Sequence, residues 1–149
     1  MQIRLSSPDD TSALHDIWRS AVLATHHFLS AEDFTQIAQQ VADDYLPHSP
    51  LWVACGPDGM PLGFLGLTGA EVDTLFIHAT ARGQGVGRAL LAHARLQAQG
   101  PLTVDVNEQN PQALGFYKRM GFVQVGRSPL DGAGRPYPLL HLREAEGPG

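Results

Sequence analysis

A chain of 149 residues has the length of one ordinary domain. Hydrophobic residues make up 43% of it and charged residues 17%, a balance that predicts a folded globular protein and argues against disorder. The formal net charge of −5, with only 10 Lys and Arg, excludes the basic surface of a nucleic-acid binder and favours cationic or neutral partners.

Several classes of protein are excluded by what the chain lacks. Residues 1–5 have no basic and then apolar segment of a signal peptide, and no run reaches the roughly 18 apolar residues of a membrane span, so we expect a cytoplasmic protein with no membrane partner. The single cysteine, Cys55, lies in an apolar run and is expected to be buried, without a disulfide in the chain. The seven histidines show no metal-binding spacing, so we expect no metal.

The N-terminal third predicts one strand and two helices. Residues 3–5 are strand-like, and Ser7-Pro8-Asp9-Asp10 combines an N-cap serine, a proline at the first helical position and an acid at the third. Apolar residues then recur at helical spacing to about Thr25. Residues 30–33 repeat the capping pattern, which predicts a second helix that stops before Pro47.

The middle of the chain predicts a hairpin, a third strand and a helix. Residues 51–55 and 62–68 are strand-like and are separated by a Gly-Pro-Asp-Gly turn. Residues 72–77 predict another strand, which leads into the glycine-rich run 82–88. A helix is expected to follow this run as far as Gln99.

The C-terminal part alternates again between strand and helix. It predicts a strand over residues 102–106, a helix capped by Asn110 and ended by Gly121, and two strands over residues 122–126 and 139–142. The complete order predicts an α/β fold with a mixed, mostly antiparallel central sheet of about seven strands, flanked by about four helices and containing at least one parallel crossover.

We expect residues 1–143 to form a single domain and residues 144–149 to be a frayed tail.

The glycine-rich run predicts a phosphate site. Successive backbone N–H groups and the positive end of the following helix can point at one anion, and glycines let the backbone approach it closely. A P-loop would need Gly-Lys-Ser/Thr, which is absent, and a dinucleotide fingerprint would need glycine where Leu90 stands, which disfavours an NAD-type site. A flexible turn between strand and helix is the alternative.

The run Arg82-Gly83-Gln84-Gly85-Val86-Gly87 resembles the pyrophosphate loop of the GCN5-related N-acetyltransferases (GNAT), whose pattern is Gln/Arg-x-x-Gly-x-Gly/Ala. Residues 104–122 are similar to the family's strand, asparagine cap and Phe-Tyr helix. The resemblance implies a GNAT fold and transfer of an acetyl group from acetyl-CoA, used as co-substrate, to an amine by direct attack in a ternary complex. Further stretches resemble the bacterial YjaB-type acetyltransferases: residues 24–30, 51–54, 106–110 and 134–140.

The same resemblance implies the cofactor site. The backbone of the strand before the loop would bind the pantetheine arm and polarise the acetyl carbonyl, the loop would bind the diphosphate, and the helix capped by asparagine would lie beside the thioester. The residues implied are Leu75, Phe76, Ile77, Arg82, Gly83, Gln84, Gly85, Val86, Gly87, Arg88, Asn110, Phe116 and Tyr117.

Two side chains are catalytic candidates. Expulsion of CoA creates a thiolate, and a phenol with a pKa of about 10 is a suitable proton donor to it, which favours Tyr117 as general acid. An alkylammonium with a pKa of about 10.4 must lose a proton before it attacks. Asp105 lies where some family members carry a glutamate base and is our candidate acceptor, although Asp105 could equally be a solvated strand carboxylate. Glu71 and Asp73, on the strand before the loop, and an ordered water are the other acceptors considered.

The acceptor amine is not specified by a motif. His26 and His27 at the end of the first helix, Asn107 and Tyr137 are candidates for binding it. The acidic charge of the chain would suit an amine-bearing small molecule, a peptide or protein N-terminus, or a lysine as acceptor. The protein itself is expected to be a monomer or a homodimer. The competing hypothesis is a non-catalytic acyl-CoA sensor, which would use the same loop without Tyr117.

Overall fold

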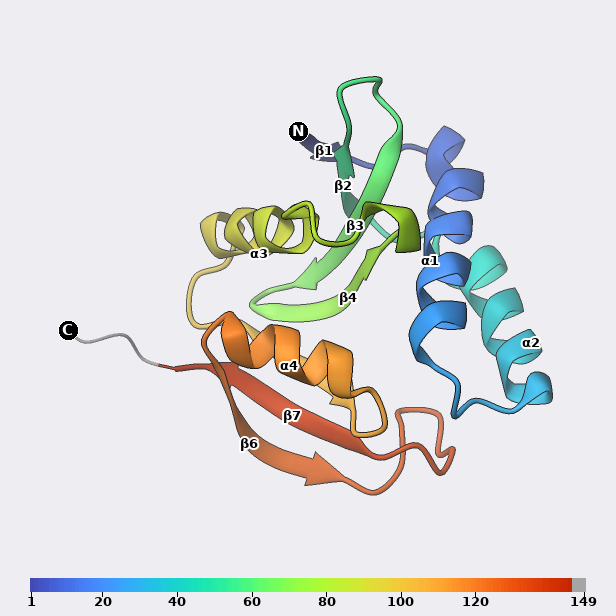
Figure 1. Cartoon of the computed structure of the whole chain (residues 1–149), viewed down its shortest axis with the longest axis vertical. Helices are drawn as coiled ribbons and strands as arrows, with labels where there is room; N and C mark the ends of the chain where they lie inside the picture. Colours follow the sequence, from blue (N-terminus) through green and yellow to red (C-terminus); the bar gives the residue numbers. More distant parts are fainter. Residues whose placement is uncertain (146–149) are drawn as a thin grey trace. The chain divides into compact units, whose positions relative to one another are not determined.

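The computed structural model describes residues 1–145 (Figure 1). Seven strands form one sheet in the order β1-β2-β3-β4-β5-β7-β6. The elements in chain order are β1 (Gln2–Leu5), η1 (Pro8–Asp10), α1 (Thr11–Thr25), α2 (Ala31–Gln40), η2 (Val41–Tyr45), β2 (Leu51–Cys55), β3 (Pro61–Thr68), β4 (Glu71–Ile77), η3 (Ala79–Ala81), α3 (Val86–Gln97), β5 (Thr103–Asn107), α4 (Pro111–Arg119), β6 (Phe122–Ser128) and β7 (Leu139–Glu144).

This architecture confirms the predicted fold class. The pairs β1–β2, β2–β3, β5–β7 and β6–β7 are antiparallel, whereas β4 and β5 are parallel. Two parallel strands need a crossover connection, and α3 lies within it, as the sequence predicted. Of the three short helical turns, η1 and η2 lie inside the two helices predicted for the N-terminal third, although their 3-10 and π geometry was not predicted. The third, η3, was not predicted, because its three residues are fewer than one period of the apolar pattern.

The C-terminal strand is longer than the sequence indicated. β7 includes Glu144, whose carboxylate accepts hydrogen bonds from Arg95 Nε at 2.5 Å and from the backbone N–H of Leu102 at 2.9 Å. The N–H of Ala145 donates to the carbonyl of Gly121 at 2.9 Å. The prediction of a frayed tail from residue 144 was therefore wrong for residues 144 and 145, and the rest of that tail lies outside the described residues.

The chain divides into two compact units, and each is described by itself. The first contains residues 1–66 and 74–93, and the second contains residues 67–73 and 94 onward. Within residues 1–145, no helix combines the length and the apolar character that crossing a bilayer requires.

The core of the first unit lies between α1 and strands β2 and β3. Leu14, Ile17 and Trp18 of α1 pack against the buried side chains of Val53 and Phe64, which confirms the apolar face predicted for the first helix. Figure 1 shows α2 beside α1, and the two helices meet where the rings of Trp18 and Phe34 stack with centroids 5.7 Å apart. Cys55 is buried in the same core, as predicted.

The entry to α1 is fixed by an ion pair. Arg4 Nη1 and Nη2 donate to the two carboxylate oxygens of Asp10 at 2.8 and 2.9 Å, and the backbone N–H of Ser7 donates to the same carboxylate at 2.8 Å. These hydrogen bonds lower the pKa of Asp10 to about 2, and those from Arg4 have the largest effect. The acid predicted at the third helical position thus closes a capping box with Ser7.

The core of the second unit lies between α4 and strands β5, β6 and β7. Alternate residues of β5 and β7 are buried, which leaves the intervening residues on the opposite face of these strands. The buried set comprises Leu102, Val104, Val106, Tyr117, Phe122, Leu140 and Leu142.

Candidate active site

The glycine-rich loop connects η3 to α3 in the first unit. Gly83 and Gly85 have φ of 75° and 81°, a left-handed conformation that residues with a Cβ rarely adopt, so glycine is required at both. Residues 83–85 are exposed, whereas the Val86 side chain is buried, which leaves only its backbone for a ligand. The first N–H groups of a helix have no acceptor within it, so the first turn of α3 can receive an anion.

The end of β4 approaches β3 unusually closely. A Cβ placed on Gly63 would lie 2.7 Å from Ile77 Cδ1 and 2.9 Å from the Phe76 carbonyl oxygen. The strand is then continued by η3, whose Ala79 N–H donates to Ser20 Oγ of α1 at 2.8 Å. The predicted backbone segment Leu75–Ile77 is therefore held against β3 and, through η3, against α1.

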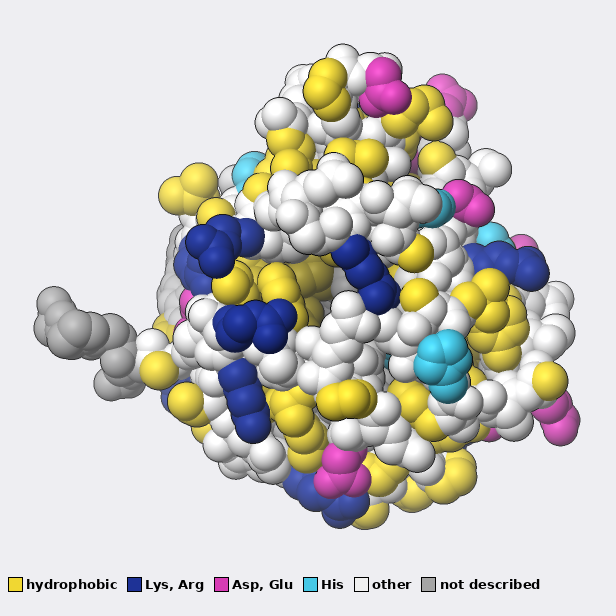
Figure 2. Space-filling model, viewed as in Figure 1, with side chains coloured by type: hydrophobic (Ala, Val, Ile, Leu, Met, Phe, Trp, Pro, Cys, Tyr) yellow, Lys and Arg dark blue, Asp and Glu magenta, His cyan; other side chains and the backbone are white. Residues whose placement is uncertain are grey.

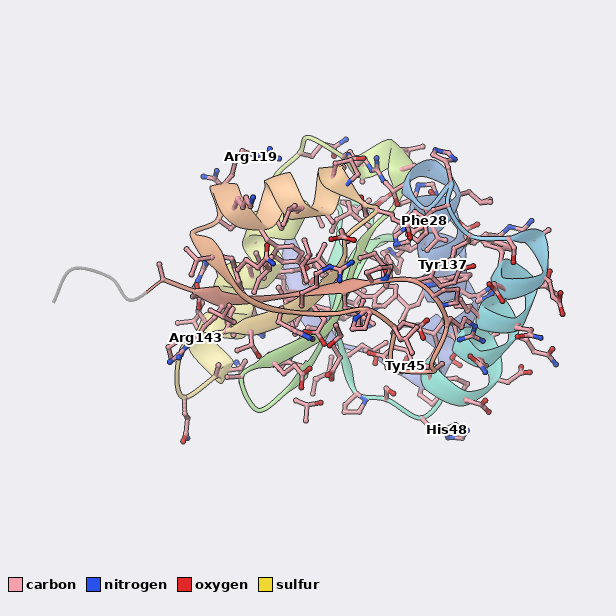
Figure 3. The ribbon with its side chains drawn as sticks, turned by 90° about the horizontal axis from the view of Figure 1, so that it is seen from below. Phe28, Tyr45, His48, Arg119, Tyr137 and Arg143 are labelled. Atoms are coloured by element: carbon pink, nitrogen blue, oxygen red, sulfur yellow. The ribbon has the colours of Figure 1, made fainter. Side chains whose placement is uncertain are left out.

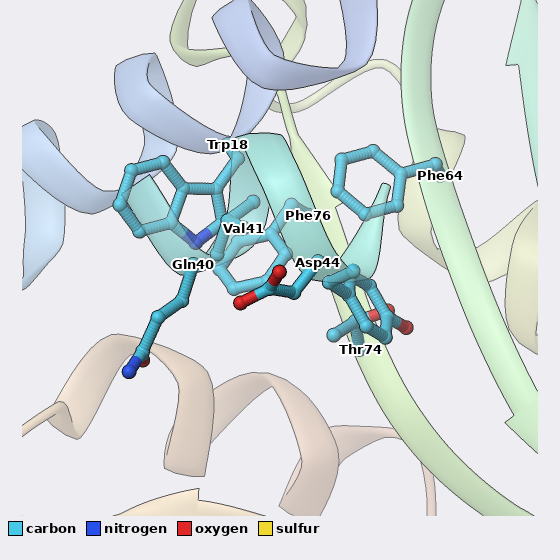
Figure 4. A pocket seen from close by; sticks show the side chains of 8 residues that line it. Trp18, Gln40, Val41, Asp44, Phe64, Thr74 and Phe76 are labelled. Atoms are coloured by element: carbon cyan, nitrogen blue, oxygen red, sulfur yellow. The ribbon is translucent and has the colours of Figure 1, made fainter. Parts of the chain in front are cut away.

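A pocket of about 530 Å³ lies beside this segment, wholly within the first unit (Figure 4). Its wall combines four aromatic rings with a single charged side chain, Asp44, and Figure 4 shows the Asp44 carboxylate among the rings of Trp18, Phe64 and Phe76. The lining residues are Trp18, Gln40, Val41, Asp44, Tyr45, Phe64, Thr74 and Phe76.

The pocket is built by η2, a turn of π-helix that follows α2. Such turns are rare and are frequent at functional sites. Tyr45, at the end of η2, is hydrogen-bonded through its hydroxyl to Thr74 Oγ1 at 2.8 Å, which ties the turn to β4. Gly66 makes room for this bond, because a Cβ there would contact the Tyr45 hydroxyl and lie 2.8 Å from Thr74 Oγ1.

Neither Asp44 nor Tyr45 was predicted from the sequence as a site residue. The available signal was the pair of glycines inside the predicted strand 62–68, since a glycine within a strand often marks a close approach of another segment.

In the second unit, α4 presents the predicted general acid. Asn110 Oδ1 accepts a hydrogen bond from the Ala113 N–H at 3.2 Å, which confirms the predicted cap. The Tyr117 ring is buried, with its centroid 5.3 Å from that of Phe122 and 5.2 Å from that of Phe116. Burial raises the pKa of the Tyr117 hydroxyl well above its ordinary value of 10, so the phenol keeps its proton at neutral pH.

Asp105 is exposed on β5, opposite His141 on β7. His141 Nδ1 lies 2.6 Å from Asp105 Oδ1, and His141 Nε2 lies 2.7 Å from Ser128 Oγ. The predicted base is therefore not an isolated carboxylate. Neither His141 nor Ser128 was singled out from the sequence, because only the register of three strands brings them to Asp105.

Comparison with known proteins decides the family. Residues 47–124 match the model of an acetyltransferase (GNAT) domain, and the chain is 49% identical over 142 residues to the peptidyl-lysine N-acetyltransferase YjaB of Salmonella typhimurium, covering 95% of this chain and 97% of that protein. The chain belongs to the GNAT acetyltransferase family. The predicted enzyme class, an acetyl-CoA-dependent N-acetyltransferase, is thereby confirmed.

Solved GNAT structures agree with this assignment. The solution structure of apo YjaB from Escherichia coli superposes with a TM-score of 0.91 and 46% identity, covering 99% of this chain and 100% of that one. The crystal structure of PaiA N-acetyltransferase from Thermoplasma acidophilum in complex with coenzyme A has the same fold, with a TM-score of 0.73 and 17% identity over 98% of this chain and 100% of that one.

The four residues predicted to bind the acceptor occupy different places in this GNAT chain. Asn107 is half-buried at the end of β5, and its carbonyl accepts the Asn110 N–H at 3.0 Å. Tyr137 is buried in the connection between β6 and β7 (Figure 3). His26 and His27 follow α1 and are bonded to it locally, His26 Nδ1 to Thr25 Oγ1 at 2.7 Å and His27 Nε2 to the Ala24 carbonyl at 3.1 Å. Their binding role stays a prediction.

His26 makes the stability of this GNAT chain depend on pH. Burial, with a smaller effect of the nearby His27 charge, lowers the pKa of His26 to about 4. The unfolded chain, with a histidine pKa of about 6.5, then binds a proton that the folded chain excludes, so the free energy of unfolding rises with pH between these values. At pH 5 we expect a loss of about 2 kcal/mol from this residue relative to pH 7.5.

Urea titrations at the two pH values measure this loss. The fall in the free energy of unfolding from pH 7.5 to pH 5 is expected to be about 2 kcal/mol smaller in His26→Gln than in the wild type. In His27→Gln, at the exposed neighbouring position, the fall is expected to be nearly as large as in the wild type, because the His27 charge is the smaller cause of the lowered pKa of His26. Equal losses in all three proteins would contradict the assignment.

Proposed function

We propose that this enzyme transfers the acetyl group of acetyl-CoA to the ε-amine of a lysine in a peptide or protein. The observation that carries the proposal is the pocket of the first unit, in which aromatic rings surround one carboxylate. The name of the YjaB relatives, peptidyl-lysine N-acetyltransferase, supports the same acceptor.

The chemistry of the pocket suits a lysine side chain. Its four methylene groups pack favourably against the partly exposed rings of Tyr45 and Phe76, while its ammonium is attracted by ring faces and by the Asp44 carboxylate. A volume of about 530 Å³ accommodates such a side chain. A protein α-amine is attached directly to the backbone and lacks the alkyl arm that would fill the apolar part, so lysine is the better fit.

Binding of acetyl-CoA is supported in each unit separately. In the first, the amides of the glycine-rich loop and the first turn of α3, with the exposed Arg88, suit a diphosphate. In the second, α4 exposes Lys118 and Arg119 near its end. Figure 2 shows Lys and Arg side chains on the surfaces of α3 and α4, although the net charge is −5. The PaiA structure in complex with coenzyme A supports the same ligand for this fold.

The reaction we propose is a direct transfer. The lysine ammonium gives one proton to Asp105, and the neutral amine attacks the thioester carbonyl, which the backbone of Leu75–Ile77 polarises. The tetrahedral intermediate then collapses, the C–S bond breaks, and the departing thiolate takes its proton from Tyr117. The nitrogen gives up its second proton, and this proton restores the Tyr117 hydroxyl through solvent. The products are acetyl-lysine and coenzyme A.

Acetylation of matched peptides tests the acceptor. The purified chain is incubated with acetyl-CoA and with three peptides: one with a free lysine and a blocked N-terminus, one with norleucine in place of that lysine, and one with a free N-terminus and no lysine. We expect thiol release and an acetylated product only with the first. Acetylation of the N-terminus alone would refute the lysine acceptor, and binding of acetyl-CoA without turnover on any amine would favour the sensor.

A further inference from the structure

Ser128, His141 and Asp105 form a continuous hydrogen-bonded row across three strands of the second unit. Asp105 of β5 is paired with His141 of β7, and Ser128 ends β6 on the other side of β7. Ser128 Oγ lies 2.7 Å from His141 Nε2, and His141 Nδ1 lies 2.6 Å from Asp105 Oδ1. The three residues are far apart in the chain and meet only through strand register.

The proton positions in this row follow from its chemistry. An ionised carboxylate only accepts hydrogen bonds, so His141 donates its Nδ1–H to Asp105. The Nε2 lone pair is then left to accept the hydroxyl proton of Ser128. A hydroxyl bonded to a base that is oriented by a third group is the arrangement that activates a serine nucleophile.

The surrounding sheet favours this arrangement. The register of β6 against β7 shifts between Gln124 and Gly126, and such an irregularity re-aims the side chains that follow it. Gly126 is paired with His141, and a Cβ there would lie 3.3 Å from His141 Cδ2, so glycine leaves space for the imidazole.

The row is also reachable by a substrate. The side chains of His141 and Asp105 are 34% and 43% exposed. Residues two apart on a strand share a face, so His141 lies on the same face of β7 as Arg143, and Figure 3 shows Arg143 on the side of β7 away from Arg119 of α4.

We propose that Ser128 is the nucleophile of a second acyl-transfer activity, hydrolysis of small activated esters, whose site shares Asp105 with the amine acetylation proposed above. Ser128 Oγ attacks the ester carbonyl and its proton passes to His141 Nε2. The bond to the leaving alcohol breaks and the alcohol takes that proton, which leaves an O-acyl-serine. Water then attacks the acyl-serine, gives a proton to Nε2, and releases the carboxylic acid as the proton returns to Ser128.

Aryl acetates are the expected substrates. Their leaving groups depart readily, so the barrier depends mainly on the nucleophile and its base, the two groups that the row supplies.

Hydrolysis of p-nitrophenyl acetate by the full chain, without acetyl-CoA, tests the proposal. We expect Ser128→Ala and His141→Gln each to lower kcat/KM about a hundredfold. A fluorophosphonate probe, whose fluoride is displaced by an activated serine, is expected to label the wild-type chain at Ser128, as located by peptide mass spectrometry, and not to label His141→Gln. The labelling uses the wild-type chain, so it tests the site even if a variant folds poorly.

His78 provides a matched control. Its Nε2 lies 3.2 Å from Asp16 Oδ2 and its Nδ1 lies 2.8 Å from Thr80 Oγ1. A hydroxyl, an imidazole and a carboxylate therefore meet here too, but the carboxylate is at Nε2 and the hydroxyl at Nδ1, the reverse of His141. His78→Gln is expected to keep wild-type ester hydrolysis. Loss of hydrolysis in His78→Gln, full hydrolysis in Ser128→Ala, or absence of label at Ser128 would each overturn the proposal.

The two activities are separable by experiment. Ser128→Ala is expected to keep wild-type acetylation of the lysine peptide by acetyl-CoA. If it loses that activity too, Ser128 itself serves amine acetylation and the proposal of a separate nucleophile is wrong. If the wild-type chain acetylates no amine yet is labelled at Ser128, the proposed function fails and the esterase site stands.

Discussion

Tyr117→Phe is expected to lower kcat for acetyl transfer about a hundredfold and to leave KM for acetyl-CoA within about twofold, because positioned acid catalysis contributes at least that much. The phenyl ring keeps the packing against Phe116 and Phe122, so only the proton donor is removed. Steady-state thiol release with the lysine peptide measures both constants, and thermal unfolding verifies that the variant is folded.

Acetyl donors whose leaving thiols differ in acidity show whether the defect of Tyr117→Phe comes from lost acid catalysis or from altered packing. A donor whose thiol is more acidic than that of coenzyme A needs less protonation, so with such a thioester the defect of Tyr117→Phe is expected to shrink several-fold. A defect of equal size with both donors would show that Tyr117 does not protonate the leaving sulfur.

Asp44→Asn is expected to lower kcat/KM for the lysine peptide about tenfold, mainly through a higher KM, since about 1.4 kcal/mol of attraction for the ammonium is lost. Asparagine has almost the same shape as aspartate, so the aromatic walls formed by Trp18, Phe64 and Phe76 remain. The measurement is peptide saturation at fixed acetyl-CoA and low ionic strength. The difference in KM between Asp44→Asn and the wild type is expected to become smaller as salt is added, because Asp44 is exposed to solvent and salt screens its charge.

The adjacent acid is the matched control for Asp44. Asp43 lies on the same π-helical turn and is also exposed, but it does not line the pocket. Asp43→Asn removes the same charge from the protein and is expected to leave KM for the peptide unchanged. If both substitutions raised KM equally, Asp44 would act only through the overall charge of the protein. The pocket would then no longer support a lysine acceptor.

Features that depend on neighbours in the chain were predictable from the sequence. Strand and helix order follows from apolar periodicity and caps, and Asn110 does cap α4 as its place before a proline indicated. The glycine-rich loop was recognisable because its left-handed turns at Gly83 and Gly85 require glycine wherever they occur. The resemblance carried by the loop and the Phe-Tyr helix led to the correct family.

Features that depend on register and packing were decided only by the tertiary structure. Ser128 and His141 reach Asp105 because β6, β7 and β5 pair in one particular alignment, and a strand's residues do not encode its partner locally. The π-helical turn ends at Tyr45, which is hydrogen-bonded to Thr74, 29 residues further along the chain, and local propensity does not contain such a contact. Hence the chain by itself determined its elements, its loop and its family, whereas the pocket and the serine–histidine–aspartate row exist only once the strands have paired.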